Sequence, residues 1–246
     1  PSQSSQASLE SNGFVQDPDV LDTWLSSALW PLTTMGWPEP ENSEAGLLEA
    51  FKPTSVLCTA REIITLWVSR MVMFNRFFAG DGGGSGNVPF KDGFIHAMIQ
   101  DGDGRKMSKS LGNGVDPLDI IHTHGTDAMR FTLAQMATQT QDVRMPVELD
   151  EATGKNTSPK FDLGRIFCNK LWNAARVALA NLDGYTPTPV ADADLRIEDR
   201  WLLSRLSTVT AEVSAALDEY RFADAARSLF DFAWNEFCSF YVEMTK

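Results

Sequence analysis

The residues best suited to chemistry are the five from Lys106 to Ser110, Lys-Met-Ser-Lys-Ser, which place two ammonium groups and two hydroxyl groups in one short segment. We call this segment the lysine loop. It follows an apolar, strand-like run, Phe94–Ile99, and a turn of alternating Asp and Gly, 101–104. Mobile cations on a glycine-hinged loop suit a ligand whose negative charge grows or moves, such as a triphosphate that loses pyrophosphate. The plainer alternative is a solvated basic turn.

The segments on either side of the lysine loop predict an α/β arrangement. Thr54–Thr59 is typical of a short strand, and Thr59 and Glu62 have the spacing of a capping box, which predicts a helix start. Apolar residues continue this helix at helical spacing: Ile63, Ile64, Trp67, Val68, Met71 and Phe74. Asp116-Pro117 predicts a second helix that Gly125 can end. This order of elements indicates half of a doubly wound, Rossmann-like parallel sheet, with the lysine loop at its carboxyl edge, where ligands bind.

The last third of the chain has a different pattern. The polar stretch Glu151–Pro159 indicates a boundary, and no strand pattern follows it. Three helical runs come next, at about Leu163–Leu182, Ile197–Tyr220 and Ala223–Met244, and their apolar stripes are typical of a bundle core. We therefore expect a flexible lead-in, an α/β half-domain and an all-α helical bundle, at residues 1–16, 17–150 and 151–246.

Composition limits the function classes. The 246-residue chain is 43% hydrophobic and 22% charged, as in ordinary globular domains, and its net charge of −12 argues against a protein that grips nucleic acid over its whole surface. A local basic track remains compatible with that charge. No apolar run approaches the roughly 18 residues of a membrane span. The chain has three cysteines, Cys58, Cys168 and Cys238, whose spacing fits neither a metal site nor a disulfide. We therefore expect a cytoplasmic protein without a bound metal.

Several motifs together resemble one family. The order of the lysine loop is the second signature of the class I aminoacyl-tRNA synthetases. Asp17–Pro38, Thr59–Met71 and Asn169–Ala174 resemble the valyl branch of that family. The resemblance covers nearly all of the chain from Asp17 onward, apart from the glycine-rich Asp81–Asn87 and the polar boundary stretch. The isoleucyl and leucyl enzymes share the lysine loop and the later helices, so they are the alternative within the family.

The resemblance implies an ATP-dependent ligase. In this family, valine attacks the α-phosphate of ATP, which carries Mg²⁺, to give valyl-adenylate and pyrophosphate, and the valyl group then passes to the terminal ribose of its tRNA. By resemblance, Lys106 and Lys109 are the catalytic residues, because they neutralise the phosphates as pyrophosphate departs. Ser108 and Ser110 complete this part of the ATP site.

The resemblance also assigns the nucleoside contacts. His96, Ala97 and Met98 lie where the family's strand end meets adenine; a satisfied, partly buried histidine is the alternative for His96. Glu62 matches the acidic residue beside the adenosine ribose, where a carboxylate can accept hydrogen bonds from both hydroxyls. The capping box competes for the same carboxylate.

The amino-acid pocket is assigned to Trp24, Ile63 and Trp67 by resemblance. Spacing supports it, because Ile63 and Trp67 are four residues apart and lie on one face of the predicted helix. Two indoles and a branched aliphatic chain make a small apolar slot that suits valine and cannot strongly reject threonine. Ordinary core packing is the alternative for any single tryptophan.

Two departures from the family pattern leave alternatives open. Ala60 stands where the family usually has glycine near the nucleotide. The family's first signature, a His-x-Gly-His type loop, and its editing domain have no counterpart in this chain. We therefore expect a fragment, inactive by itself, that joins the second half of a catalytic domain to the start of a helical anticodon-binding domain. A non-catalytic synthetase-like binding module is the alternative from another class.

Overall fold

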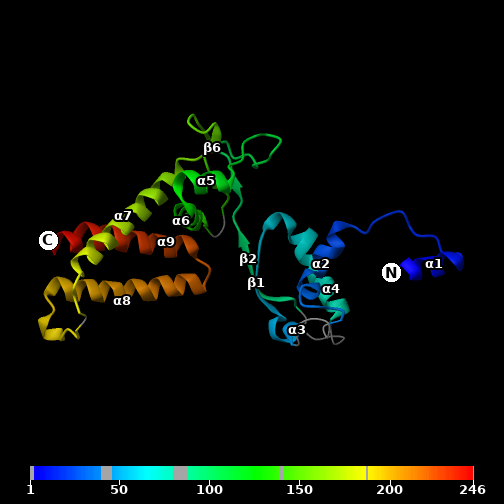
Figure 1. Ribbon diagram of the computed structural model, residues 1–246, viewed down its shortest axis with the longest axis horizontal. Coiled ribbons are helices and arrows are strands. Elements are labelled where there is room, and N and C mark those ends of the chain that lie inside the picture. The colour runs from blue at the N-terminus through cyan, green and yellow to red at the C-terminus, as the bar shows by residue number, and fades with distance from the viewer. Residues whose placement is uncertain (1–2, 40–45, 80–87, 139–140, 187, 246) are drawn as a thin grey trace. The chain divides into compact units, whose positions relative to one another are not determined.

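The computed structural model describes residues 3–39, 46–79, 88–138, 141–186 and 188–245, without the side chains of residues 3–5 (Figure 1). It divides the chain into two compact units, Pro1–Phe94 and Ile95–Lys246. The glycine-rich segment Asp81–Asn87, predicted from its composition to be a surface insertion, lies outside the described residues.

The first unit is mostly helical, with one strand pair. Strand β1 pairs with β2, whose last two residues belong to the second unit. Helices α2 and α4 pack together, and Ala28, Leu32 and Met71 are at most 1% exposed. Helix α1 forms in the segment that the sequence predicts as a flexible lead-in. The elements are α1 (Gln3–Ser11), α2 (Thr23–Thr33), α3 (Leu47–Phe51), β1 (Thr54–Ala60), α4 (Ser69–Phe78) and β2 (Phe90–His96).

The sequence predicts that an α-helix begins directly after β1, but the α-helix begins later. Thr59 is buried inside β1, and the first helical turn is a 3₁₀ turn, Arg61–Ile63, whose N-cap Ala60 makes no side-chain hydrogen bond. A π-helical turn, Ile64–Val68, follows, and the α-helix starts only at Ser69. The capping-box prediction is therefore wrong, because strand pairing extends the backbone through Thr59. Glu62 lies in the 3₁₀ turn and is exposed.

The second unit carries the lysine loop on a small sheet. Strand β3 pairs with β4 in parallel, Ile99 opposite Val143, as a Rossmann-like sheet requires. Helix α5 begins with the predicted Asp116 cap, whose carboxylate accepts from the backbone N–H of Leu118 (2.8 Å), and ends at Gly125. The elements before the long helices are β3 (Ile99–Gln100), α5 (Pro117–His124), α6 (Thr126–Met136), β4 (Val143–Arg144), β5 (Glu148–Asp150) and β6 (Lys155–Thr157).

Strands β5 and β6 form an antiparallel hairpin in and beside the polar stretch that the sequence predicts as a boundary, with Leu149 opposite Asn156. The hairpin was missed because its strands are three residues long and have no apolar alternation. Gly154 adopts a left-handed φ of +67° in the turn, a conformation that glycine reaches without strain.

The remaining elements confirm the predicted helical region. Helices α8 and α9 lie side by side (Figure 1). The Arg205 guanidinium of α8 donates two hydrogen bonds, of 2.8 and 2.9 Å, to Glu236, which lies in the π-helical segment after α9. No helix in the described ranges is long and apolar enough to cross a membrane. These elements are α7 (Lys160–Asn181), a 3₁₀ turn (Asp192–Asp194), α8 (Ile197–Asp218), α9 (Phe222–Asp231), a π-helical segment (Phe232–Tyr241) and α10 (Val242–Met244).

Gly164 lets α7 approach α6 closely. A β-carbon at this position would lie 2.6 Å from the carbonyl oxygen of Ala128, and nearer still to Oγ1 of Thr132. We expect Gly164→Ala to lower the free energy of unfolding by about 1–2 kcal/mol, because the overpacking cost exceeds the gain in helix propensity of about 1 kcal/mol. Denaturant unfolding measures this change. Asn169→Ala, on the exposed side of α7, is the control, and equal stability of the two variants would contradict the close approach.

Candidate functional site: the lysine loop and its supports

The turn before the lysine loop is built around one buried carboxylate. Asp101 is 3% exposed, and its Oδ1 accepts from the backbone N–H groups of Asp103 (3.0 Å) and Arg105 (2.8 Å). Its Oδ2 accepts from Nε of Arg105 (2.9 Å) and from Nδ2 of Asn113 (2.8 Å). The Asp-Gly repeat therefore forms a tight, hydrogen-bonded turn, with Gly104 at φ +81°, in place of the hinge that the glycines suggested.

Asn113, which follows the lysine loop in the chain, also holds it by hydrogen bonds. While its Nδ2 binds Asp101, its Oδ1 accepts from the backbone N–H of Ser108 at 2.9 Å. The Ser108 hydroxyl lies 3.2 Å from the Ser110 hydroxyl and accepts from the backbone N–H of Leu111 at 3.2 Å. The backbone of the loop is thus held by side chains that precede and follow it.

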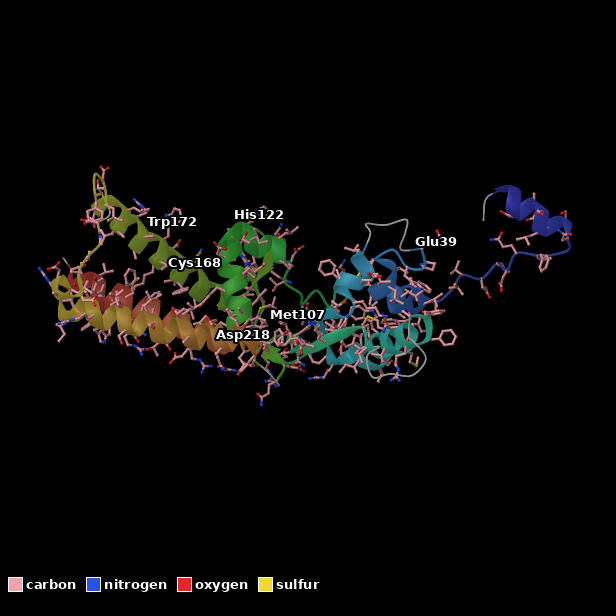
Figure 2. All side chains as sticks on the ribbon, turned by 90° about the horizontal axis from the view of Figure 1, so that it is seen from below. Glu39, Met107, His122, Cys168, Trp172 and Asp218 are labelled. Carbon is pink, nitrogen blue, oxygen red and sulfur yellow. The ribbon has the colours of Figure 1, made fainter. Side chains whose placement is uncertain are left out.

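The two lysines of the loop are exposed, while Met107 and Ser108 between them are anchored. Lys106, Lys109 and Ser110 are exposed and Ser108 is half-buried. Met107, labelled in Figure 2, packs against the buried cluster of Ile120, Met145 and Phe161. A cavity of about 380 Å³ lies beside the loop, lined by Ser108, Lys109, Gly112, Gly114, Val115, Asp116, Pro117 and Asn156. This arrangement presents two exposed lysine side chains on a backbone that is fixed by hydrogen bonds and by Met107.

The predicted adenine segment runs from His96, the last residue of β2, through the two residues that lead into β3. His96, Ala97 and Met98 are half-buried, and the ring Nδ1 of His96 lies 2.9 Å from the carbonyl oxygen of Ala97. The backbone N–H of Met98 donates to the carboxylate of Asp142 at 3.2 Å, and the carbonyl of Met98 accepts from the backbone N–H of Val143 at 2.8 Å. Side chain and sheet therefore both fix this segment.

The first unit brings two of the three predicted amino-acid-pocket residues to one helix interface. Trp67 donates its indole N–H to the carbonyl oxygen of Ser27 in α2 at 3.0 Å. One turn earlier in α2, the ring of Trp24 faces the Arg70 guanidinium, 5.7 Å from the ring centroid. Ile63 is half-buried at the end of the 3₁₀ turn.

A cavity of about 560 Å³ in the first unit is lined by Trp67 but not by Trp24 or Ile63. Its walls come from α2, α3, β1 and α4, with further residues beside them: Trp30, Pro31, Thr34, Met35, Leu47, Phe51, Thr54, Ser55, Val56, Leu57, Trp67, Met71 and Phe90. The predicted grouping of Trp24, Ile63 and Trp67 around one ligand stays a prediction.

Comparison with known proteins assigns these elements. The model of the family "tRNA synthetases class I (I, L, M and V)" matches residues 2–146, which include the lysine loop and more than half of the chain. The chain belongs to the class I tRNA synthetases. A second model, the anticodon-binding domain of tRNA ligase, matches residues 199–246, from α8 onward.

Relatives of this class I synthetase chain are similar along nearly its whole length. It is 48% identical to a valine–tRNA ligase of Rhodopirellula baltica over 98% of the chain, and 49% identical to one of Pseudothermotoga lettingae over 96%. It spans 26% and 25% of the length of these relatives, respectively.

Solved class I structures support the fold. LeuRS of Agrobacterium radiobacter K84, in a ternary complex with tRNA and LeuAMS, matches with a TM-score of 0.72 over 90% of this chain and 27% of that one, at 22% identity. Mycobacterium tuberculosis methionyl-tRNA synthetase, in complex with methionyl-adenylate, matches with a TM-score of 0.63 over 89% of this chain and 40% of that one, at 25% identity. The α/β sheet followed by helices is therefore the class I arrangement.

Sequence reasoning did not find the supports of the loop. The sequence indicates Asp101 only as part of a turn, and it predicts no role for Asn113 or Asn156. A short polar side chain with several local backbone donors is a signal that could have identified Asp101. Asn156 gave no such signal, because it lies 44 residues after Gly112, whose carbonyl it binds. Within the described residues, no group of three or more His, Cys, Asp or Glu side chains is placed to hold a metal.

The Asp101 network makes the stability of the turn depend on acid pH. The pKa of Asp101 is lowered from 3.8 to about 2, chiefly by the hydrogen bond from Asn113 and then by the Arg105 backbone N–H. Between pH 4 and 2 the unfolded chain binds this proton more readily, so the stabilisation is complete above about pH 4 and is lost as pH falls toward 2. We expect Asn113→Ala to weaken this loss.

Thermal unfolding of wild type and Asn113→Ala between pH 2 and 5 measures the effect as the difference between the two curves. Asp150 and Asp199, whose pKa values are also lowered by hydrogen bonds, contribute equally to both proteins and cancel. Parallel curves would contradict the role of Asn113.

Proposed function

We propose that this chain is part of a valine–tRNA ligase that forms valyl-adenylate and transfers the valyl group to tRNA. The observation that carries the proposal is the 48% identity to a valine–tRNA ligase over 98% of the chain. Because the chain spans about a quarter of that relative, the proposal concerns the full-length enzyme, which we expect to be cytoplasmic.

In the proposed reaction, a carboxylate oxygen of valine bonds to the α-phosphorus of ATP as the bond to pyrophosphate breaks. A ribose hydroxyl of the tRNA then attacks the valyl carbonyl, and AMP leaves. ATP brings its Mg²⁺ as part of the substrate. Lys106 and Lys109 stabilise the charge that develops on the departing pyrophosphate, and Ser108 and Ser110 belong to the same ATP site.

The other assignments concern binding. His96, Ala97 and Met98 contact adenine, and all three residues are half-buried where β2 leads into β3. Glu62 accepts from the ribose hydroxyls, a role that its exposed position in the 3₁₀ turn permits.

Trp24, Ile63 and Trp67 enclose the valine side chain. The two indoles supply apolar surface at the interface of α2 with the segment that leads into α4. A pocket of this kind selects by size and shape more than by charge.

The test is amino-acid-dependent exchange of labelled pyrophosphate into ATP by the full-length enzyme. We expect exchange with valine to exceed exchange with isoleucine or leucine by at least tenfold, since one methylene in an apolar pocket is worth about 1–3 kcal/mol. Faster exchange with isoleucine or leucine would assign the chain to another branch of the family. Background exchange with every amino acid would favour a non-catalytic binding module.

A further inference from the structure

The β5–β6 hairpin contacts the segment that follows the lysine loop. Nδ2 of Asn156, in β6, donates to the carbonyl oxygens of Gly112 at 2.8 Å and Gly114 at 2.9 Å. Asn156 is half-buried, and it lies in a stretch, 147–198, that neither family model covers. One amide group therefore fixes two backbone carbonyls whose positions determine how the lysine loop ends.

The contact is close to Lys109 along the chain. The backbone N–H of Gly112 donates to the carbonyl oxygen of Lys109 at 3.3 Å, which closes a turn over Ser110 and Leu111. Gly112 has a left-handed φ of +63°, so this turn requires a specific backbone conformation. By holding the Gly112 carbonyl, Asn156 holds the residue whose amide closes the turn on Lys109.

The hairpin has its own attachment, which does not depend on Asn156. The neighbouring residue Lys155 forms an ion pair with Asp119 of α5, and its pKa is raised, first by the hydrogen bond to Asp119. Thr157 pairs with Glu148 across the hairpin, and Ser158 beyond it is buried. Removing the Asn156 amide should therefore loosen the C-terminal end of the lysine loop, at Gly112 and Gly114, while the hairpin stays in place.

We propose that Asn156 is a positioning residue for the lysine loop: its two hydrogen bonds hold Gly112 and Gly114 so that Lys109 is presented in the geometry that the phosphates need. The inference rests on the proposed function, because that function gives the lysine loop its role in ATP activation. Asn156 touches no substrate in this account and acts through the backbone of the loop.

Two measurements test the proposal with Asn156→Ala in the full-length enzyme. Valine-dependent pyrophosphate exchange should fall about tenfold in kcat, as expected for the loss of two hydrogen bonds, with the KM for valine unchanged. Limited trypsin cleavage after Lys106 and Lys109 should become several-fold faster while the Tm stays within 2–3 °C of wild type. Cleavage and exchange both unchanged would overturn the proposal, and so would a lost kcat accompanied by a large fall in Tm.

Further variants separate the amide from the hairpin. Asn156→Asp places a carboxylate against two carbonyl oxygens, so its exchange rate should fall at least as far as that of Asn156→Ala. Asn156→Gln keeps an amide donor and should recover part of the rate. Lys155→Met breaks the pair with Asp119 and leaves the Asn156 bonds, so its exchange rate should stay near wild type. A rate for Lys155→Met as low as that of Asn156→Ala would assign the effect to the hairpin as a whole and overturn the residue assignment.

The proteolysis also separates this inference from the proposed function. If wild type showed no exchange with valine, the proposed function would fail. Faster cleavage of Asn156→Ala at Lys106 and Lys109 would still establish that Asn156 holds the loop, whereas unchanged cleavage would show that it does not.

Discussion

Replacing Lys109 by alanine in the full-length enzyme is expected to lower the rate of valyl-adenylate formation about 10²- to 10³-fold, with little change in valine binding. Removing one preorganised contact to developing charge typically costs about 3–4 kcal/mol of transition-state stabilisation. Lys109 is placed for such a contact, because its side chain is exposed beside a cavity of about 380 Å³ while its carbonyl is tied to Gly112. The charge on the departing pyrophosphate grows during the step, so the loss should appear mainly in kcat.

The measurement is the rate of pyrophosphate exchange at varied valine and ATP concentrations. Lys160→Ala, which removes an exposed lysine at the start of α7, is the matched control and should behave as wild type. Lys106→Ala should show a loss of the same kind, because both ammonium groups are assigned to the phosphates. A constant kcat with a raised KM for valine would instead place Lys109 in amino-acid binding.

The sequence was a good guide to the elements that are defined locally. Asp116-Pro117 and Gly125 set the ends of α5 through a side-chain cap and a glycine with a positive φ of 93°, and both signals act within a few residues. The long apolar stripes predicted α7 and α8 to within a few residues of their ends. Such features need no knowledge of the distant chain.

The failures involve segments whose conformation depends on distant partners. Thr59 and Glu62 have the spacing of a capping box, yet Thr59 remains in β1 because it is part of the strand pair with β2. Strand β6 is recognisable only through its pairing with β5 and through the carbonyls that Asn156 binds. Long-range pairing overrides local propensity in both cases.

Within the candidate site, the sequence indicated the charged side chains, Lys106 and Lys109, but not the residues that hold the backbone around them. The motif singled out Lys106 and Lys109 because ammonium groups suit phosphates. The carboxylate of Asp101 and the amides of Asn113 and Asn156 fix the backbone around them, and a short polar side chain in a loop has many ordinary uses.

Truncating Trp67 to leucine in the full-length enzyme is expected to raise the ratio of kcat/KM for isoleucine to that for valine by about 10-fold or more. Isoleucine is longer than valine by one methylene. In an apolar pocket with room for it, this methylene contributes about 1–3 kcal/mol of binding free energy. Leucine in place of the indole removes part of a rigid ring and so opens space where the valine side chain is proposed to bind.

Stability will also change, since Trp67 joins two helical segments through its hydrogen bond to the Ser27 carbonyl. Cutting a buried aromatic residue to alanine costs about 3–5 kcal/mol, and leucine keeps part of that packing. The measured quantity must therefore be the ratio of two substrates on one enzyme preparation, because the fraction of active enzyme cancels in it.

Trp30→Leu is the matched control for the size filter. Trp30 lines the same cavity of about 560 Å³ as Trp67, but it has no place in the proposed valine pocket, so its truncation should leave the isoleucine-to-valine ratio unchanged. A ratio that moves in Trp67→Leu alone supports the pocket. A ratio that stays constant in both variants would make Trp67 a packing residue of the α2 interface, and equal shifts in both would place the effect in the cavity, away from Trp24 and Ile63.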